Sequence, residues 1–279
     1  MASRKTNTLI TIAAVLAIAV AGAFGLRALW NTAKSNLSAD VCSVGPYDLD
    51  PTQAVVAATM VGAVTKYRIH LPERAAVLVL AAALQESKLT NLAPGDGDRD
   101  SVGVLQQRPS QGWGGGSAAR LTDVGEATTE FLDALMKIPH WRTMPLADAI
   151  QAVQISADGS AYAQHEQEAQ ALADALQGVR PAGITCSFQK PTKVATSSVV
   201  AQQASTELGI STPRATSAHV VRAAGARWQT AAWFVANADR LGIERVAYQG
   251  KVWTRTDGWK PAPAASGAAV VATLYNLKQ

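Results

Sequence analysis

The sequence contains little charge, few aromatic residues and only two cysteines. Of its 279 residues, 16% are charged and 6% are aromatic, whereas 48% are hydrophobic. That hydrophobic content excludes an intrinsically disordered chain, which has too little apolar surface to bury. Two cysteines exclude a disulfide-dense miniprotein and a zinc site with four thiolates. The length suits about two domains of the usual ~100–200 residues.

Motifs of several enzyme and binding-protein classes are also missing. The four histidines are scattered without His-x-His or His-x-x-x-His spacing, so we predict neither a metal site nor a cofactor. The sequence contains no Gly-x-Gly-x-x-Gly fingerprint, no P-loop and no Gly-x-Ser-x-Gly elbow. The basic residues near the C-terminus are spread out, and we predict no nucleic-acid partner.

An uncharged run of 18 residues occupies positions 9–26. As a helix it would be about 27 Å long, close to a bilayer core of ~30 Å. Arg4 and Lys5 precede it, but Arg27 and Lys34 follow and nearly balance them, so charge alone does not decide the orientation. Together with the cysteines described below, the run predicts a single-pass anchor over about 9–30, with a cytoplasmic N-terminus and extracytoplasmic main domains. The tip, anchor and stalk would fill residues 1–39. Small-x-small sites within 19–23 leave a cleaved signal peptide as an alternative, and a buried soluble helix is the third.

Residues 40–186 form an acidic segment with 10 basic and 17 acidic residues, and the two cysteines, Cys42 and Cys186, lie at its ends. If they pair, the bridge ties together the ends of one domain and stabilises it by roughly 4–5 kcal/mol. Disulfides persist outside the cytoplasm, so a pairing would agree with export. Two unrelated buried thiols are the alternative.

Helix signals dominate the segment between the cysteines. Residues 75–84 are apolar all round, which indicates a central helix covered on every side. We therefore predict an all-α domain over 40–186, with a long loop at about 90–117. The expected helices cover about 50–67, 72–87, 122–137, 143–156 and 160–177.

The remaining sequence predicts a basic linker over 187–198 and a small α/β domain over 199–279. That domain would contain helices at about 199–208 and 227–241, a strand at 218–222, and a hairpin turning at Gln249-Gly250. The tail from Pro261 shows no pattern that we assign. The predicted fold class is thus α+β, with a transmembrane helix, an all-α domain and a small α/β domain.

Glu86 is the strongest candidate for a catalytic residue. Helical spacing places it on one stripe with Val79, Ala82 and Ala83, in the last turn of the apolar helix. Burial and the negative end of the helix dipole would both raise its pKa. Protonation of a glycosidic oxygen requires such a proton-bearing carboxyl group. On position alone, a glutamate near a helix C-terminus is more commonly a surface residue.

The surrounding motifs point to a family. Gln85-Glu86-Ser87 ends the helix, and Gly103-Val104-Leu105-Gln106-Gln107 follows after a short loop. This arrangement resembles lytic transglycosylases and goose-type lysozymes, in which a helix ends in Glu-Ser and a Gly-Leu-Met-Gln-like element follows. The wider pattern over about 45–178 looks like an actinobacterial membrane-anchored branch of that lysozyme-like fold. The stretch 152–156, Ala-Val-Gln-Ile-Ser, departs at most positions from the family's Ala-Tyr-Asn-Ala-Gly-like element.

The resemblance implies a peptidoglycan-cleaving enzyme that acts on the MurNAc-GlcNAc bond, with Glu86 as general acid and then general base. In a transglycosylase the sugar's own C6 hydroxyl attacks, so no second carboxylate is needed. A hydrolase needs a second group to position water, and an inverting pair stands ~6.5–9.5 Å apart. Asp96, Asp98 and Asp100 lie on the loop that would line the cleft. A solvated acidic turn is the alternative for these three.

Further substrate contacts follow from the same resemblance. Gln106 and Gln107 would bind N-acetyl groups or brace the loop. Trp113 would stack on a sugar or plug the loop, Tyr162 would reach the cleft or pack in the core, and Gln154 would replace the family's Asn. The candidate contact residues are Ser87, Asp98, Asp100, Gln106, Gln107, Trp113, Gln154 and Tyr162.

A non-catalytic alternative uses the same fold. The altered 152–156 element favours a wall-binding or scaffold protein that retains a lysozyme-like domain. The stretch 228–259 distantly resembles small domains attached to bacterial cell-wall enzymes, which implies a binding or spacer role. The partners expected under either hypothesis are peptidoglycan strands, the cell membrane through the N-terminal helix, and an envelope or secretion complex.

Overall fold

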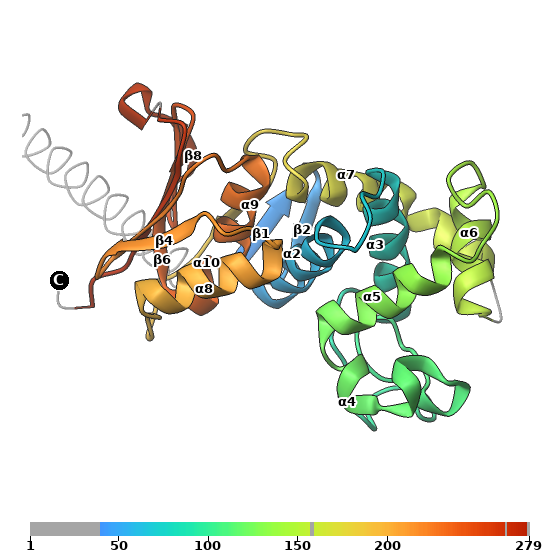
Figure 1. Cartoon of the computed structure of the whole chain (residues 1–279). Helices are drawn as coiled ribbons and strands as arrows, with labels where there is room; N and C mark the ends of the chain where they lie inside the picture. Colours follow the sequence, from blue (N-terminus) through green and yellow to red (C-terminus); the bar gives the residue numbers. More distant parts are fainter. Residues whose placement is uncertain (1–39, 157–158, 266, 278–279) are drawn as a thin grey trace, which may run out of the picture. The chain divides into compact units, whose positions relative to one another are not determined.

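The computed structural model describes residues 40–156, 159–265 and 267–277. The chain from Asp40 onward forms one compact unit. Within it, a helical lobe carries the candidate acid and a second lobe is built on a six-stranded sheet (Figure 1).

Two of the predicted helices begin directly after an aspartate. Asp50 precedes the first helix, and its backbone N–H donates to Gln53 Oε1 at 2.7 Å. Asp123 precedes another helix and accepts a hydrogen bond from the N–H of Glu126 at 2.9 Å. The α-helices of this lobe are α2 (Pro51–Thr65), α3 (Arg74–Ser87), α4 (Ala118–Leu121), α5 (Val124–Leu135), α6 (Leu146–Gln154) and α7 (Glu166–Leu176). Its short 3-10 helices are η1 (Pro109–Gln111), η2 (Trp113–Gly116) and η3 (Gly159–His165).

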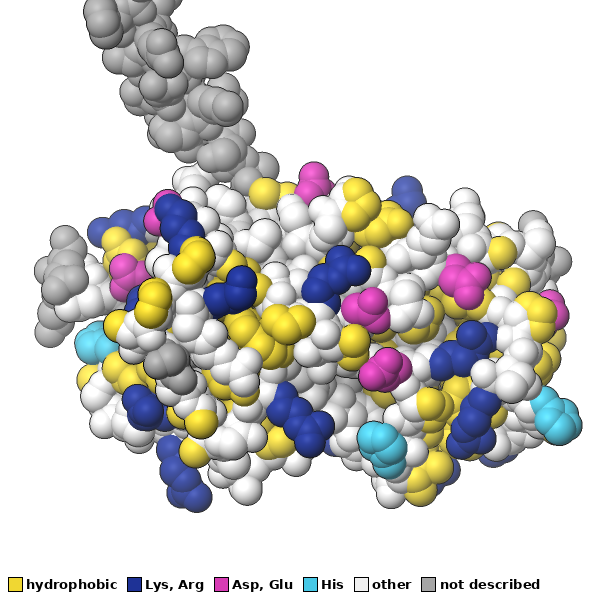
Figure 2. Space-filling model, turned by 90° about the horizontal axis from the view of Figure 1, so that it is seen from above, with side chains coloured by type: hydrophobic (Ala, Val, Ile, Leu, Met, Phe, Trp, Pro, Cys, Tyr) yellow, Lys and Arg dark blue, Asp and Glu magenta, His cyan; other side chains and the backbone are white. Residues whose placement is uncertain are grey.

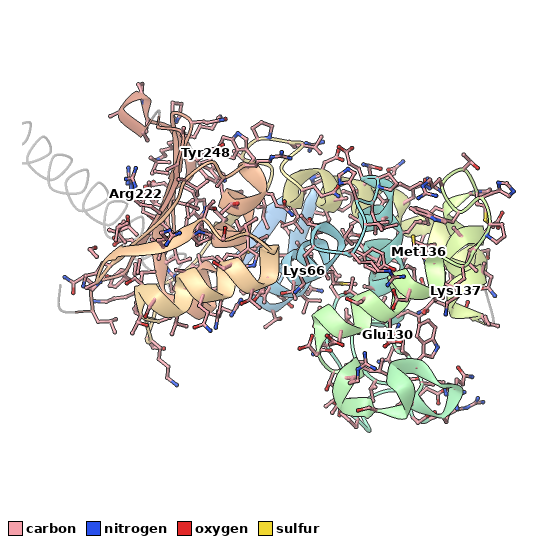
Figure 3. The ribbon with its side chains drawn as sticks, in the orientation of Figure 1. Lys66, Glu130, Met136, Lys137, Arg222 and Tyr248 are labelled. Atoms are coloured by element: carbon pink, nitrogen blue, oxygen red, sulfur yellow. A yellow bond between two sulfur atoms is a disulfide. The ribbon has the colours of Figure 1, made fainter. Side chains whose placement is uncertain are left out.

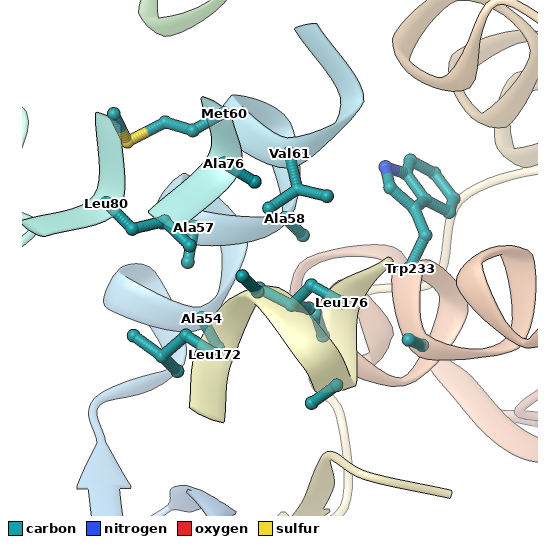
Figure 4. Packing of buried hydrophobic residues seen from close by; sticks show 14 of the residues in the cluster. Ala54, Ala57, Ala58, Met60, Val61, Ala76, Leu80, Leu172, Leu176 and Trp233 are labelled. Carbon is teal, nitrogen blue, oxygen red and sulfur yellow. The ribbon is translucent and has the colours of Figure 1, made fainter. Parts of the chain in front are cut away.

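Helix α3 is the centre of this lobe. Every residue from Ala75 to Leu84 is buried, as the apolar run predicts. Helices α2, α5, α6 and α7 all pack against it. Figure 4 shows the alanines of α2 and α3 facing Leu172 and Leu176 of α7. Because alanine is small, these helices approach closely, and the end of α3 is held in place by its neighbours.

The prediction that residues 40–186 are all-α is wrong. A three-stranded sheet joins the two ends of this segment, with strand order β2-β1-β3. Its strands are β1 (Val41–Val44), β2 (Tyr47–Leu49) and β3 (Thr185–Ser187). Strands of three or four residues are too short to show an alternating pattern, and so the sequence does not reveal them.

The predicted disulfide is confirmed. Cys42 of β1 and Cys186 of β3 are direct cross-strand partners, and their sulfur atoms are bonded. The bridge therefore closes the helical lobe at the point where the chain enters and leaves it.

The predicted membrane-spanning helix is not found in the part of the chain that the structure describes, where no helix is both long and apolar enough to cross a bilayer. The longest of the helices named above, α2, has 15 residues, and a span needs about 20. The run at 9–26 lies outside the described residues. The predicted fold class is corrected accordingly: the described chain is α+β and contains no such helix.

The second lobe is a fully antiparallel six-stranded sheet with strand order β4-β5-β9-β6-β7-β8. The predicted hairpin is confirmed, and both Gln249 and Gly250 have the positive φ of a two-residue turn. The strands are β4 (Pro213–Ser217), β5 (Val220–Ala223), β6 (Ile243–Tyr248), β7 (Lys251–Thr254), β8 (Gly258–Pro261) and β9 (Val270–Leu274). The helices of this lobe are α8 (Ser197–Leu208), α9 (Trp228–Ala236) and α10 (Ala238–Leu241).

The two lobes are in contact where α2 meets α8. Glu207 of α8 accepts hydrogen bonds from Thr59 of α2 at 3.2 Å, from Trp233 of α9 at 2.8 Å and from Arg240 at 2.9 Å. A Cβ at Gly62 would lie 2.4 Å from the backbone oxygen of Glu207, so glycine is needed where α2 meets α8. These contacts attach the sheet lobe to the helix that packs on α3.

Candidate active site

Glu86 lies in the last turn of α3, where the helix leaves the core. Lys88 follows in the left-handed conformation and ends the helix. The carboxyl group is half-buried, and Tyr162 of η3 donates its hydroxyl proton to Glu86 Oε1 at 2.5 Å. Tyr162 itself is only 1% exposed. The structure thus brings together two predicted site residues that lie far apart in the sequence.

Burial raises the pKa of Glu86, and hydrogen bonds from Tyr162 and Gln154 lower it by less. The net effect favours the protonated acid. The pKa of Tyr162 is raised by its own burial and by its hydrogen bond to Glu86, so the tyrosine stays protonated and acts as the donor. Because Tyr162 donates to Oε1, a proton carried by the acid would lie on Oε2.

The segment 103–107 is tied to the end of α3 and to α6. Ser87 Oγ donates to the backbone oxygen of Val104 at 2.7 Å, and Gln154 Nε2 donates to that of Leu105 at 2.9 Å. Gly103 forms an isolated bridge with Leu92. The two motifs therefore meet in the structure, and the hydroxyl of Ser87 is used within the protein.

Gly103 cannot be replaced without displacing its neighbours. Its φ is +76°, and a Cβ there would lie 2.1 Å from the backbone oxygen of Leu121. We expect Gly103→Ala to lower the free energy of unfolding by about 2–4 kcal/mol, measured by chemical denaturation. Gly112→Ala is the matched control, because Gly112 also has a positive φ but no atom within 4 Å of its Cβ position. Equal losses in both variants would show that the close contact at Gly103 does not matter.

None of the three loop carboxylates takes part in this arrangement. Asp100 accepts hydrogen bonds from Arg108 Nε at 2.7 Å and from the N–H of Ser110 at 2.9 Å, and these contacts hold its pKa well below the usual range. It is an ionised carboxylate that fixes the loop. The side chain of Asp98 is 91% exposed. Asp96 accepts a hydrogen bond from the N–H of Ala93 within its own turn.

The remaining predicted contacts are used inside the loop region. Gln107 is 2% exposed and donates to the backbone oxygen of Ala127 at 3.3 Å, which makes it a brace. Gln106 Nε2 donates to the oxygen of Gly103 at 2.9 Å. Trp113 is half-buried and packs against the hydrophobic core.

One neighbour of the acid was missed by the sequence reasoning. Gln85, directly before Glu86, contacts His165 Nε2 through its Oε1 at 3.0 Å, and Gln164 donates to the same oxygen at 3.1 Å. No local pattern reveals these contacts, because η3 lies about 80 residues after α3. They attach η3, and with it Tyr162, to the end of α3.

Nothing in the described residues points to a metal. They contain no group of three or more His, Cys, Asp or Glu side chains that could hold one. A cavity of about 440 Å³ lies between the start of α2, residues 89–91 and α10, and another of about 400 Å³ lies against the sheet. Neither is lined by Glu86.

No family model matches the chain, and no curated protein matches it. The function therefore has to be inferred from the chemistry of the Glu86 site.

Proposed function

We propose that the protein cleaves glycosidic bonds in the glycan strands of peptidoglycan, with Glu86 as general acid and then general base. The observation that carries this proposal is the half-buried carboxyl group of Glu86, whose pKa burial raises and whose Oε1 accepts from Tyr162. Burial thus shifts Glu86 toward the protonated form, which is the state that a general acid needs.

The placement of the other carboxylates favours transglycosylation over hydrolysis. Glu86 would give its proton to the glycosidic oxygen as the bond to the sugar's C1 breaks. The C6 hydroxyl of the same sugar would then attack C1 and lose its proton to Glu86, which gives a 1,6-anhydro end and restores the acid. A hydrolase needs a second group to activate water. Asp100 is engaged by Arg108, and Asp98 is in solvent.

The disulfide supports action outside the cytoplasm, where peptidoglycan lies, since such bonds persist in oxidising compartments. An assembly that needs a local opening in the wall is the kind of partner that this activity suits.

Mass analysis of fragments released from purified sacculi tests the proposal. We expect fragments that end in 1,6-anhydro sugars. Fragments with reducing ends would indicate a hydrolase, and the absence of any fragment would overturn the enzymatic proposal. Sacculus binding without cleavage would select the wall-binding alternative. The element 152–156 favours that alternative, because Gln154 donates to the oxygen of Leu105 and thus contacts the protein itself.

Tyr162→Phe tests how the hydrogen bond from Tyr162 affects the pKa of Glu86. The tyrosine hydrogen bond lowers the pKa of Glu86, so its removal should raise that pKa further. The alkaline limb of the kcat/KM profile, on which Glu86 loses its proton, should then move to higher pH. Tyr67→Phe is the matched control, because Tyr67 donates to Asp133 at 2.6 Å and does not contact Glu86. An unchanged limb, or one at lower pH, would contradict the assigned roles.

A further inference from the structure

The six-stranded sheet has one face toward the helices and one face away from them. Cross-strand partners share a face, so the register assigns each residue to one side. Helices α8 and α9 pack on the inner face, whose buried residues are Val221, Ala223, Val246, Tyr248, Trp253, Val270, Ala272 and Leu274. In Figure 3, Arg222 extends from the opposite side of the sheet, away from the helices.

The residues of the outer face form two rows across the strands. One row runs through successive partners on all six strands: Arg214, Arg222, Val271, Ala247, Val252 and Lys260. The neighbouring row contains Val220, Thr273, Arg245, Thr254 and Gly258. Neither row contains an acidic or an aromatic residue. In the first row, cations at both ends flank an aliphatic centre, whereas in the second row Arg245 lies on the inner strand β6 between two threonines.

The cations of this face lack carboxylate partners, with one exception. Lys260 pairs with Asp257 at 2.7 Å. For Arg214, Arg222 and Arg245, the described residues provide no carboxylate oxygen within 4.0 Å. Arg214 and Arg222 stand directly opposite each other on adjacent strands, where like charges destabilise a sheet. By contrast, Figure 2 shows charges of both signs mixed on the face that it presents.

We propose that this outer face, defined by the two rows above, binds an anionic lipid surface. The arginines would contact headgroup phosphates, while the half-buried Val252 and Val271 would face the acyl boundary. The first row, with an aliphatic centre and cations at its two ends, matches the layers of a lipid surface, which is anionic outside and apolar beneath.

The test places a probe on the face itself. In the full chain, Val252→Cys would carry an environment-sensitive fluorophore, and the label is specific because the two native cysteines are bonded to each other. We expect a blue shift with vesicles that contain phosphatidylglycerol and none with phosphatidylcholine alone. The shift should disappear in 1 M salt, where the Debye length falls to about 3 Å. If the labelled variant fails to fold, Lys260→Cys provides a second label position.

The double variant Arg214→Gln/Arg222→Gln should raise the half-saturating lipid concentration roughly 25-fold, because each cation at an anionic surface contributes about fivefold. Its melting temperature should be unchanged or higher, since the repulsion between the two arginines is removed. Lys137→Gln/Arg142→Gln removes the same charge from the helical lobe, where Figure 3 labels Lys137 far from Arg222, and should leave the shift intact.

Three results would overturn the proposal. They are equal shifts in the two double variants, an equal shift with neutral vesicles, and a shift with soluble polyphosphate but none with anionic vesicles. The result with polyphosphate would identify a polyanion site instead. A shift produced by a protein partner but not by vesicles would also overturn the proposal.

Discussion

Glu86→Gln is expected to reduce the release of fragments from peptidoglycan by at least about 10³-fold. A carboxamide cannot donate and recover a proton at neutral pH, and positioned general acids contribute typically 10²–10⁴-fold. Because Glu86 is assigned both proton transfers, we expect the loss of rate to lie near the upper end of that range. The rate should be measured as soluble muropeptide released per unit time from purified sacculi.

The fold should survive this substitution. The amide oxygen of glutamine can still accept the hydrogen bond that Tyr162 donates to Oε1. Its neutral side chain also suits the half-buried position at least as well as a carboxyl group. Asp98→Asn is the matched control, since it makes the same chemical change on an exposed side chain and should leave the rate within about twofold. If both variants retained the activity of the parent chain, Glu86 would have no part in catalysis.

Removal of the disulfide should produce the largest loss of stability. The bridge closes a loop with a sequence separation of 144 residues. In the chain-entropy treatment, opening such a loop costs about 5 kcal/mol, and measured losses are about 2–5 kcal/mol. We expect Cys42→Ser/Cys186→Ser to lower the melting temperature by roughly 10–20 °C, measured by thermal unfolding.

Reduction of the native chain provides the control for this prediction. Dithiothreitol should lower the melting temperature of the parent chain to that of the double variant and leave the variant unchanged. Melting temperatures within about 3 °C of each other, with and without the bridge, would mean that the short sheet around it supplies the stability instead.

Local signals in the sequence predicted the helices well. Caps such as Asp50 and Asp123 mark the starts of α2 and α5, and the apolar run over 75–84 identifies α3 as the central helix. The one-helix prediction for 160–177 is only partly right, because the chain forms η3 before α7.

Elements that depend on distant partners were missed. Strand β1 pairs with β3 across almost the whole helical lobe, so neither strand has a local signature. The tail from Pro261 showed no pattern, yet it contains β9, an inner strand that lies between β5 and β6. A strand in this position owes its stability to both neighbours, and those contacts are invisible in a local window.

In the candidate site, too, the features with a local sequence signal were predicted and those that depend on distant partners were not. Helical spacing and the loop motif place Glu86 correctly at the end of the buried helix. The loop residues are less predictable, because a side-chain type does not specify its partner. Asp100 reads as a possible catalytic carboxylate, but Arg108 and Ser110 engage both of its oxygens. Tyr162 reads as a substrate contact, but its hydroxyl reaches the acid itself.

The covalent link between β1 and β3 also determines how the molecule responds to a protease. The turn around Gly95 is exposed and lies inside the loop that the bridge closes. A single cut there would leave both fragments joined through Cys42 and Cys186. The nicked molecule would keep its mass apart from one added water, and its two pieces would separate on a denaturing gel only after reduction. A damaged copy would thus retain the acid-bearing helix attached to the sheet lobe.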